Sequence, residues 1–322
     1  MRVSVATGGR LHIGFTNMSD GFGRCYGSMG VALDSPRTTV VIENHDSLEV
    51  EGANAEQIRA YVVRFCELYS VEPRVTIQIR ERIPEHVGLG SGTQLALAIG
   101  MGLARVCGVR AQVHDLASAL GRGRRSGVGI AAFETGGFVV DAGRKKGDHG
   151  LRKTPTVVFR RDFPPGWCFV VAVPGARHGL NGPDEEGVFR ALAPPARISE
   201  EICRLTLLKL MPALIEQDIE EFGCALTAID RKTGQYFAEV QGGIYGQGEA
   251  SEIIDVMLQA GAHGAGQSSW GPSVYGLVDE VRAIPVEKEV RRALDERRDG
   301  GSVFIAHGRN RGAKVETERE GS

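Results

Sequence analysis

A glycine-rich segment at residues 84–93 has the composition of a phosphate-binding loop. It reads Pro-Glu-His-Val-Gly-Leu-Gly-Ser-Gly-Thr and separates an alternating apolar run from an apolar stretch of helical length. Glycines let an anion approach the unpaired N–H groups at a helix N-terminus, and serine and threonine hydroxyls add donors. The segment lacks the motifs of Walker loops and dinucleotide-binding folds. We expect it to bind phosphate, with a plain strand-to-helix turn as the alternative, through Gly88, Gly90, Ser91, Gly92 and Thr93.

The glycine-rich sequence between residues 9 and 27 combines cationic side chains, a histidine and a carboxylate. It contains Arg10, His12, Asp20 and Arg24. Arginine forms paired hydrogen bonds to phosphate or carboxylate groups, and an aspartate can hold a metal ion or a ribose hydroxyl. We expect the two arginines to bind substrate, with a hairpin of solvated charges as the alternative.

Residues 121–137 hold three arginines among glycines, at positions 122, 124 and 125. The pattern indicates an anion clamp that includes Arg124, Arg125 and Ser126, with a solvated loop as the alternative. Glu134 lies among small apolar residues, which is an unusual setting for a carboxylate and suggests a functional role.

Residues 264–276 form a fourth candidate segment, in which small residues, two serines and a tryptophan precede a strand pattern. It indicates a second backbone cradle with the tryptophan as a wall. The alternative is a tight turn with the tryptophan in the core. The candidate ligand-binding residues here are Gln267, Ser268, Ser269 and Trp270.

The elements that must position these segments alternate between strand and helix in the first half of the chain. Apolar residues recur at helical spacing between Ile58 and Leu68. Residues 93–106 are apolar nearly all round, which predicts a central buried helix. The second half has helical patterns at 198–229 and 286–297. Predicted strands are 38–42, 74–79, 138–140, 169–173, 273–278 and 302–306.

A cluster of prolines between residues 152 and 166 marks the predicted domain boundary. We therefore predict an N-terminal domain at 1–160 and a C-terminal domain at 161–308. Residues 309–322 are charged and poor in apolar side chains, so we expect a mobile tail there.

Composition excludes several classes of function. The 322 residues carry a formal net charge of -2, which argues against general nucleic-acid binding. The six cysteines are scattered without a C-x-x-C pair, as expected for free thiols in a reducing compartment. No apolar run reaches the length of a membrane span. We expect a cytoplasmic protein that acts on small molecules, with no nucleic-acid or membrane partner.

Three of these segments together resemble the GHMP superfamily of galactokinase, homoserine kinase, mevalonate kinase and phosphomevalonate kinase. Residues 84–93 match the pattern P-x-x-x-G-L-G-S-S/G, Gly9-Arg10 stands at the first motif, and residues 264–278 resemble the third. The resemblance implies an α+β, GHMP kinase-like fold in two parts. The N-terminal half would be similar to domain 2 of ribosomal protein S5, and the C-terminal half would be a ferredoxin-like α/β unit.

One departure from the kinases bears on the reaction. Mevalonate-kinase-like members carry a segment of type P-S-G-x-D-N-x-x-x-x-x-G-G, whose aspartate is catalytic. Residues 125–137 align with this segment, and Gly129 stands at the aspartate position. Glycine has no group that accepts a hydroxyl proton, so kinase chemistry of that type is not expected.

A closer resemblance is to the β-ribofuranosylaminobenzene 5'-phosphate synthases. It runs from about residue 2 to residue 307 and rests on segments 9–15, 123–134, 173–182 and 266–272. These pentosyltransferases join phosphoribosyl pyrophosphate to 4-aminobenzoate or 4-hydroxybenzoate, with release of CO2 and pyrophosphate, in methanopterin biosynthesis. The resemblance implies this activity, with Mg2+ as cofactor, in a homodimer. The phosphate loop would hold the pyrophosphate.

The resemblance also implies roles for single residues. His12 or His178 would accept a proton near the para substituent of the benzoate. Arg177 and the arginines at 122, 124 and 125 would hold the ribose 5'-phosphate or the benzoate carboxylate. A GHMP-type kinase that uses ATP and a non-catalytic sensor of phosphorylated metabolites are the alternatives. The acidic candidates for catalysis or for Mg2+ are Asp20, Glu134 and Asp184.

Overall fold

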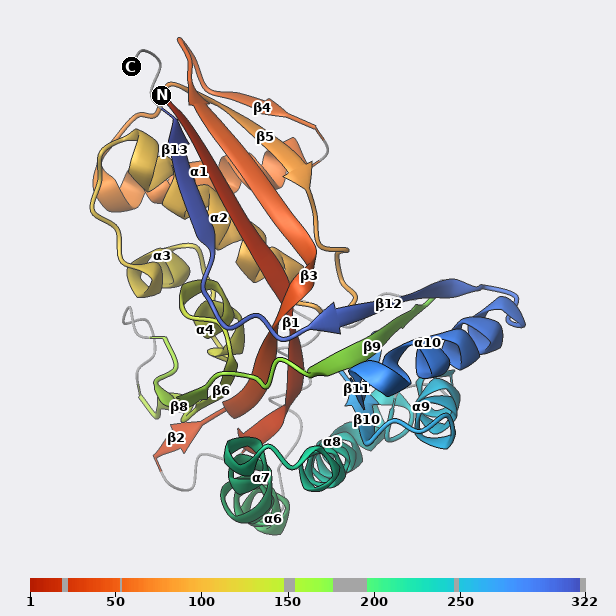
Figure 1. Ribbon diagram of the computed structural model, residues 1–322. Coiled ribbons are helices and arrows are strands. Elements are labelled where there is room, and N and C mark those ends of the chain that lie inside the picture. Colours follow the sequence, from red (N-terminus) through yellow and green to blue (C-terminus); the bar gives the residue numbers. More distant parts are fainter. Residues whose placement is uncertain (19–22, 53, 148–153, 176–195, 246–248, 319–322) are drawn as a thin grey trace.

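Two long antiparallel strands, β1 (Arg2–Asn17) and β3 (Gly27–Asn44), form the spine of the fold in the computed structural model. The structure describes residues 1–18, 23–52, 54–147, 154–175, 196–245 and 249–318. Figure 1 shows both strands running from the end of the molecule that holds the two chain termini towards the C-terminal half. Each strand therefore contributes residues to both parts of the molecule.

The N-terminal sheet has seven strands. Besides β1 and β3 they are β4 (Glu49–Glu51), β5 (Val75–Glu81), β6 (Phe138–Asp141), β8 (Val157–Arg161) and β13 (Lys314–Glu318). Their order is β13-β1-β3-β5-β4, with β6 paired to β3 and β8 paired to β6. The strand pair β4–β5 is parallel, and the other pairs are antiparallel.

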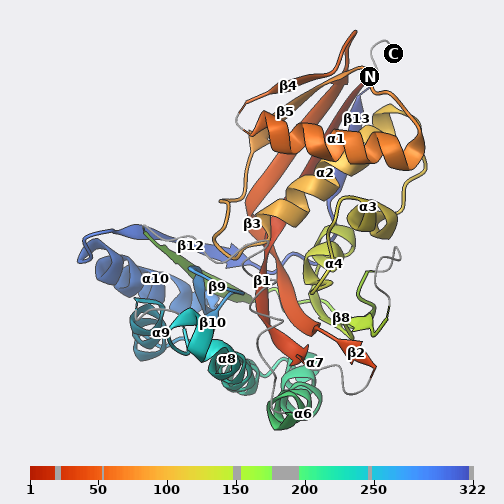
Figure 2. The same cartoon turned by 180° about the vertical axis from the view of Figure 1, so that it is seen from behind.

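Helices cover one face of the N-terminal sheet, as seen from behind in Figure 2. The core between helices and sheet includes Val5 and Ile42 from the strands. It also includes Phe65 from helix α1 and Ile99 from helix α2. These positions alternate along the strands and recur at helical spacing, so each element buries one apolar face. The helices are α1 (Ala55–Tyr69), α2 (Ser91–Val106), α3 (Val113–Ala119) and α4 (Val128–Glu134).

The C-terminal sheet is antiparallel and has four strands. In order they are β10 (Gly264–Gln267), β11 (Val274–Asp279), β9 (Trp167–Pro174) and β12 (Gly301–His307). The helices α9 (Glu249–Gln259) and α10 (Glu280–Asp295) share a core with one face of this sheet, and α8 (Ile219–Gln241) shares a core with the other.

Strand β9 is apolar throughout because it is buried on both faces. Cys168 and Val170 pack in the core with α9 and α10, whereas Phe169 and Val171 pack in the core with β1 and α8. Alternate side chains of a strand point to opposite faces. The remaining elements are β2 (Arg24–Cys25), β7 (Arg144–Lys145), α6 (Ala196–Leu205), the π-helix η1 (Thr206–Leu210) and α7 (Met211–Glu216).

The α+β class expected from the sequence is confirmed, because helices pack on largely antiparallel sheets. Each of the six predicted strands coincides with an observed strand, and the buried helix predicted at 93–106 is α2. The domain boundary near residue 160 stays a prediction. Within the part of the chain that the structure describes, no helix combines the length and the apolar character needed to cross a membrane.

The prediction of a mobile tail is wrong for residues 309–318. The segment 314–318 is β13, which pairs with the first residues of β1 at the edge of the sheet. Val315 faces the N-terminal core while its charged neighbours face solvent, so a single apolar side chain is enough for an edge position. Arg309 also donates to the backbone oxygens of Ala132 and Gly312. The main chain supplies the pairing that a count of apolar residues overlooks.

Helix α10 begins earlier than the pattern at 286–297 predicts. It starts at Glu280, and the Asp279 carboxylate accepts a hydrogen bond from the Arg282 N–H as an N-cap. Pro285 lies inside the helix. The first turn of the helix therefore precedes the proline, outside the predicted range.

Candidate active site

The N-terminus of α2 lies open between two arginines. Gly90 is its N-cap, with φ of 82°, and no side chain caps the helix. A Cβ added to Gly90 would lie 3.1 Å from Arg10 Cγ, and one added to Gly92 would lie 3.2 Å from Arg122 Nη1. Two guanidinium groups therefore flank unpaired N–H groups and the positive end of the helix dipole. We call residues 88–93 with Arg10 and Arg122 the anion cradle.

Both arginines are held in place by neighbouring groups. Arg10 donates through Nη1 to the Gly88 oxygen, and its backbone N–H donates to the Leu89 oxygen at 3.0 Å. Arg122 donates to the Tyr61 hydroxyl and lies 5.4 Å from the centre of that ring. Among the described residues, Arg122 Nε has no hydrogen-bond partner although it is buried. The cradle thus has an unused donor beside the helix N-terminus.

The serine–tryptophan segment joins the cradle to strand β1. Ser268 Oγ donates to the Gly88 oxygen at 2.8 Å and accepts the His12 N–H at 3.0 Å. The Ser269 N–H donates to the His12 oxygen at 3.2 Å. Gly88 has φ of 85°, and an added Cβ would lie 2.3 Å from the Ser268 oxygen. Only glycine fits this contact, so Gly88 lets the loop and the serine–tryptophan segment pack backbone against backbone.

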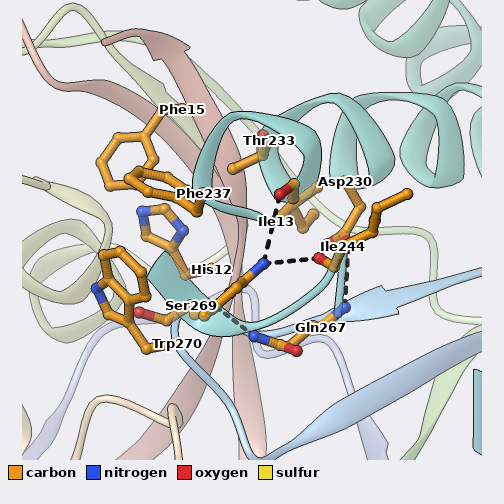
Figure 3. A pocket seen from close by; sticks show the side chains of 13 residues that line it. His12, Ile13, Phe15, Asp230, Thr233, Phe237, Ile244, Gln267, Ser269 and Trp270 are labelled. Carbon is orange, nitrogen blue, oxygen red and sulfur yellow. Dashed lines mark hydrogen bonds between the residues drawn. The ribbon is translucent and has the colours of Figure 1, made fainter. Parts of the chain in front are cut away.

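A pocket with aromatic walls lies beside the cradle. It leaves about 30 Å³ for the centres of water-sized molecules, within about 380 Å³ of non-atom space that includes open solvent. Figure 3 shows Phe15, Phe237 and Trp270 around the His12 ring. The ring of Phe237 lies 4.5 Å from that of Trp270 and 6.1 Å from that of Phe15, with edge-to-face geometry in both pairs. Such walls suit a flat aromatic ligand.

His12 faces this pocket as an uncharged side chain. Burial, and then the positive charge of Arg10, lower the pKa of His12 to about 3. Its Nε2 is buried and has no hydrogen-bond partner among the described residues. The ring can therefore form a hydrogen bond with a ligand, but it is a weak base near neutral pH. This low pKa argues against the proton-accepting role predicted for His12.

Asp230 is a pocket residue that the sequence did not reveal. It lies on α8, lines the pocket and is buried. Burial raises the pKa of its carboxyl to about 8, against the hydrogen bonds that it accepts from Gln267 N–H at 3.1 Å and Tyr275 O–H at 2.9 Å. Gly266 packs on this carboxyl, and an added Cβ would lie 2.4 Å from it. Within a long amphipathic helix, only the burial of Asp230 distinguishes it.

The other predicted residues lie in different places. Thr93 faces Gly129 near the start of α2, and Gln267 lines the pocket. Arg24 donates to the oxygens of Ala142 and Gly143 and to Thr156, so its guanidinium holds a turn rather than a substrate. Asp20, Arg177, His178 and Asp184 lie outside the described residues.

Glu134 does not line the pocket. It is the last residue of α4, and its carboxylate lies 3.1 Å from Nε2 of His114 on α3. The Glu134 side chain is about one-third exposed. The apolar residues next to Glu134 in the sequence are the buried side chains of the preceding turns of α4. Among the described residues, no group of three or more His, Cys, Asp or Glu side chains could hold a metal ion. The structure therefore gives no support to Glu134 as a metal ligand.

The arginine segment is anchored by a buried carboxyl, Asp141. It accepts hydrogen bonds from the Ser28 hydroxyl, from Gly127 N–H at 2.9 Å and from Gly143 N–H at 2.8 Å. Ser28 Oγ also lies 2.8 Å from Ser126 Oγ, and because the Ser28 hydrogen is used by Asp141, the Ser126 hydroxyl is the donor in this pair. These bonds fix the end of the segment that carries Arg124, which is exposed, and Arg125, which is half-buried.

Replacing Asp141 by asparagine is expected to lower stability most at low pH. Burial raises the pKa of Asp141 from 3.8 to about 6, so the native state binds this proton more tightly than the unfolded chain. The stability that the group contributes is present below about pH 4 and is lost as the pH rises to about 6. Asparagine cannot accept from both backbone N–H groups, which costs about 1–3 kcal/mol.

Urea unfolding of wild type and Asp141→Asn at a series of pH values measures this effect. The difference in unfolding free energy should shrink as the pH rises from about 4 to about 7. A difference that grows over the same range would contradict the raised pKa.

The chain is similar to known families and proteins over most of its length. The GHMP kinases N terminal domain matches residues 57–137, and the GHMP kinases C terminal domain matches residues 210–296. A beta-ribofuranosylphenol 5'-phosphate synthase from Methanothermobacter thermautotrophicus is 34% identical over 96% of this chain and 97% of its own. The protein of the same name from Archaeoglobus fulgidus is 32% identical, covering 96% and 98%.

Solved structures of low identity share the fold. A homoserine kinase from Cytophaga hutchinsonii has a TM-score of 0.70 at 18% identity, covering 98% of this chain and 97% of its own. Mevalonate diphosphate decarboxylase from Staphylococcus aureus has a TM-score of 0.68 at 12% identity, covering 98% of each chain. The GHMP kinase-like fold is therefore confirmed.

Proposed function

Because the chain belongs to the family of beta-ribofuranosylphenol 5'-phosphate synthases, we propose that it joins phosphoribosyl pyrophosphate to a para-substituted benzoate. The chain is thus an enzyme, a pentosyltransferase, and its product in methanopterin biosynthesis is a C-riboside 5'-phosphate. CO2 and pyrophosphate are the other products. The relatives' name specifies a phenol, which supports 4-hydroxybenzoate as the acceptor, with 4-aminobenzoate as the second candidate.

One observation carries the proposal: the anion cradle adjoins a pocket with aromatic walls. Arg10 of the cradle and His12 of the pocket are two residues apart on β1, about 7 Å along an extended strand. Ser268 hydrogen-bonds to Gly88 of the cradle and to the His12 backbone, and Ser269 also hydrogen-bonds to the His12 backbone. A diphosphate in the cradle and an aromatic ring in the pocket would therefore meet near His12. ATP-dependent kinases need no aromatic acceptor site of this kind.

The cradle supplies what the leaving group requires. As pyrophosphate departs, ribose carbon 1 gains oxocarbenium character and negative charge develops on the leaving oxygens. Arg10, Arg122 and the N–H groups at the start of α2 are donors already oriented towards that charge. The ring carbon that bears the carboxylate then bonds to ribose carbon 1, and loss of CO2 restores aromaticity.

The roles of the 5'-phosphate, Mg2+ and quaternary structure are further proposals. Arg125 and the other cations of segment 121–137 are candidates for the 5'-phosphate. Mg2+ prefers phosphate oxygens with one or two carboxylates, but the described residues at the cradle are cationic and do not fit a protein-built Mg2+ site. No step here depends on the ion. Homodimer assembly stays a prediction from the resemblance, and a cytoplasmic location stays a prediction from the composition.

A product assay tests the proposed function. Ring-labelled 4-hydroxybenzoate or 4-aminobenzoate is incubated with phosphoribosyl pyrophosphate and Mg2+, and the products are separated by charge. A phosphorylated riboside whose sugar–ring bond survives acid hydrolysis is the expected result. Binding of both substrates without any product would favour the alternative of a non-catalytic sensor.

Phe237→Ala is expected to weaken acceptor binding without affecting the donor. The phenyl ring forms the wall between Phe15 and Trp270, and its loss removes aromatic contacts worth about 1–3 kcal/mol. The Michaelis constant for the benzoate should rise about tenfold to a hundredfold, while that for phosphoribosyl pyrophosphate stays unchanged. Val240→Ala, which shortens a more exposed apolar side chain on the same helix, is the control. An unchanged Michaelis constant for the benzoate would show that the benzoate ring does not bind in this pocket.

A further inference from the structure

We propose that Asp230 is the base that accepts the proton of the para substituent while the ring attacks the ribose. The inference rests on the proposed function and adds a catalytic residue to it. Asp230 lines the aromatic pocket, and each of its two oxygens accepts one hydrogen bond, from Gln267 N–H or Tyr275 O–H. A carboxylate has about four lone-pair sites, so acceptor capacity is left for a ligand.

Two strands establish which end of the pocket Asp230 occupies. Along β1 the chain runs from Arg10, at the cradle, to Gly14, where an added Cβ would lie 2.8 Å from Thr233 Oγ1 of α8. From Gly266 on β10, which packs on the Asp230 carboxyl, the chain continues past the end of the strand to Ser268, which bonds to the cradle. The α8 end of the pocket is therefore the end farther from the cradle.

The position of the reacting carbon then orients the acceptor. Ribose carbon 1 carries the pyrophosphate, so it lies beside the cradle. The ring carbon that bears the carboxylate must approach it from the near end of the pocket. The para substituent, on the opposite side of the ring, would then point towards α8, where Asp230 lines the pocket (Figure 3). His12 lies between the two ends and is left to hydrogen-bond the substrates.

The proton moves once in each direction. Asp230 takes the hydroxyl proton while the ring carbon that bears the carboxylate bonds to ribose carbon 1. At the same time the bond between ribose carbon 1 and the pyrophosphate oxygen breaks. The ring is then a dienone that still carries the carboxylate. When CO2 leaves, the electron pair of its bond returns to the ring, the oxygen becomes a phenolate, and it takes the proton back from Asp230. No net proton is consumed.

The basicity of Asp230 suits this transfer. Its pKa is raised to about 8 by burial, so about a tenth of the groups are ionised at pH 7. The titratable groups around it in the described chain are Tyr275 on β11, Tyr245 after α8 and, across the pocket, His12 on β1. Burial raises the pKa of both tyrosines and lowers that of His12 to about 3. Asp230 is thus the group that titrates near pH 8.

The test is the pH dependence of kcat/KM for 4-hydroxybenzoate in wild type, Asp230→Asn and Tyr275→Phe. In wild type the value should rise with pH up to about 8. Asp230→Asn should lower kcat about a hundredfold and abolish this rise, with KM for phosphoribosyl pyrophosphate unchanged. Tyr275→Phe removes a hydrogen bond to the charged form, so the midpoint should move to higher pH. Asp295→Asn, at an exposed position on α10, is the control and should match wild type.

The outcomes separate this inference from the proposed function. If wild type forms no product, the proposed function fails. If wild type is active and Asp230→Asn keeps its rate and pH profile, the inference alone is overturned. If Asp230→Asn does not fold, Tyr275→Phe decides, because an unshifted midpoint there overturns the inference as well.

Discussion

Arg10→Leu should lower kcat/KM for phosphoribosyl pyrophosphate by on the order of a hundred- to a thousandfold. The guanidinium lies over Gly90 at the N-terminus of α2, where the leaving diphosphate would develop its charge. Removing one oriented donor from a low-dielectric site costs transition-state stabilisation, so kcat should fall as well as affinity. Steady-state kinetics with the donor varied at saturating benzoate measures both constants.

Two further variants separate charge from geometry. Arg10→Lys keeps the positive charge but loses the planar fork, so its kcat/KM should lie between those of wild type and Arg10→Leu. Arg80→Leu, at an exposed position on β5, is the matched control and should match wild type. If Arg10→Leu changes the melting temperature but neither kinetic constant, the arginine only holds Gly88 and the cradle is not the diphosphate site.

Gly129→Asp should abolish most synthase activity, by about a hundredfold or more, without creating a kinase. Position 129 is buried in α4, and an added Cβ would already lie 3.2 Å from Thr93 Cγ2. A carboxylate placed there is buried, which carries a large desolvation cost, and it pushes against the first turn of α2. Restoring the aspartate of mevalonate-kinase-like enzymes therefore disturbs the cradle and supplies no alcohol site.

Gly129→Ala is the control for this substitution. It adds the crowded Cβ without the charge, and it gains about 1 kcal/mol of helix propensity, so its activity should stay within a few-fold of wild type. Thermal melting and transfer of labelled phosphate from ATP to a panel of alcohols complete the comparison. Phosphorylation of any alcohol by Gly129→Asp at a rate near that of a kinase would contradict this account of position 129.

The parts of the site carried by local sequence could be predicted. The glycines of residues 84–93 and the apolar pattern of α2 are adjacent in the chain, and together they identify a helix N-terminus open to an anion. Local pattern also located each predicted strand, because alternation and β-branched content are properties of the strand itself.

The parts that depend on distant contacts could not be predicted. Asp230 is distinguished by burial against Gly266 and Tyr275, which come from strands more than thirty residues away. Three arginines in one segment look alike in sequence, and only the packing of Arg122 on Tyr61 places it at the cradle. The sequence suggested Arg24 as an anion ligand, but its guanidinium donates hydrogen bonds to three oxygen atoms of the protein. Long-range packing decides which polar side chains face a pocket.

The most direct test of the central claim is release of labelled CO2. Carboxyl-labelled 4-hydroxybenzoate is incubated with the enzyme, phosphoribosyl pyrophosphate and Mg2+, and CO2 and pyrophosphate are counted together. We expect equal amounts of both products, and none of either when ATP replaces phosphoribosyl pyrophosphate. Absence of CO2 from both 4-hydroxybenzoate and 4-aminobenzoate, together with phosphate transfer from ATP to an alcohol, would contradict it.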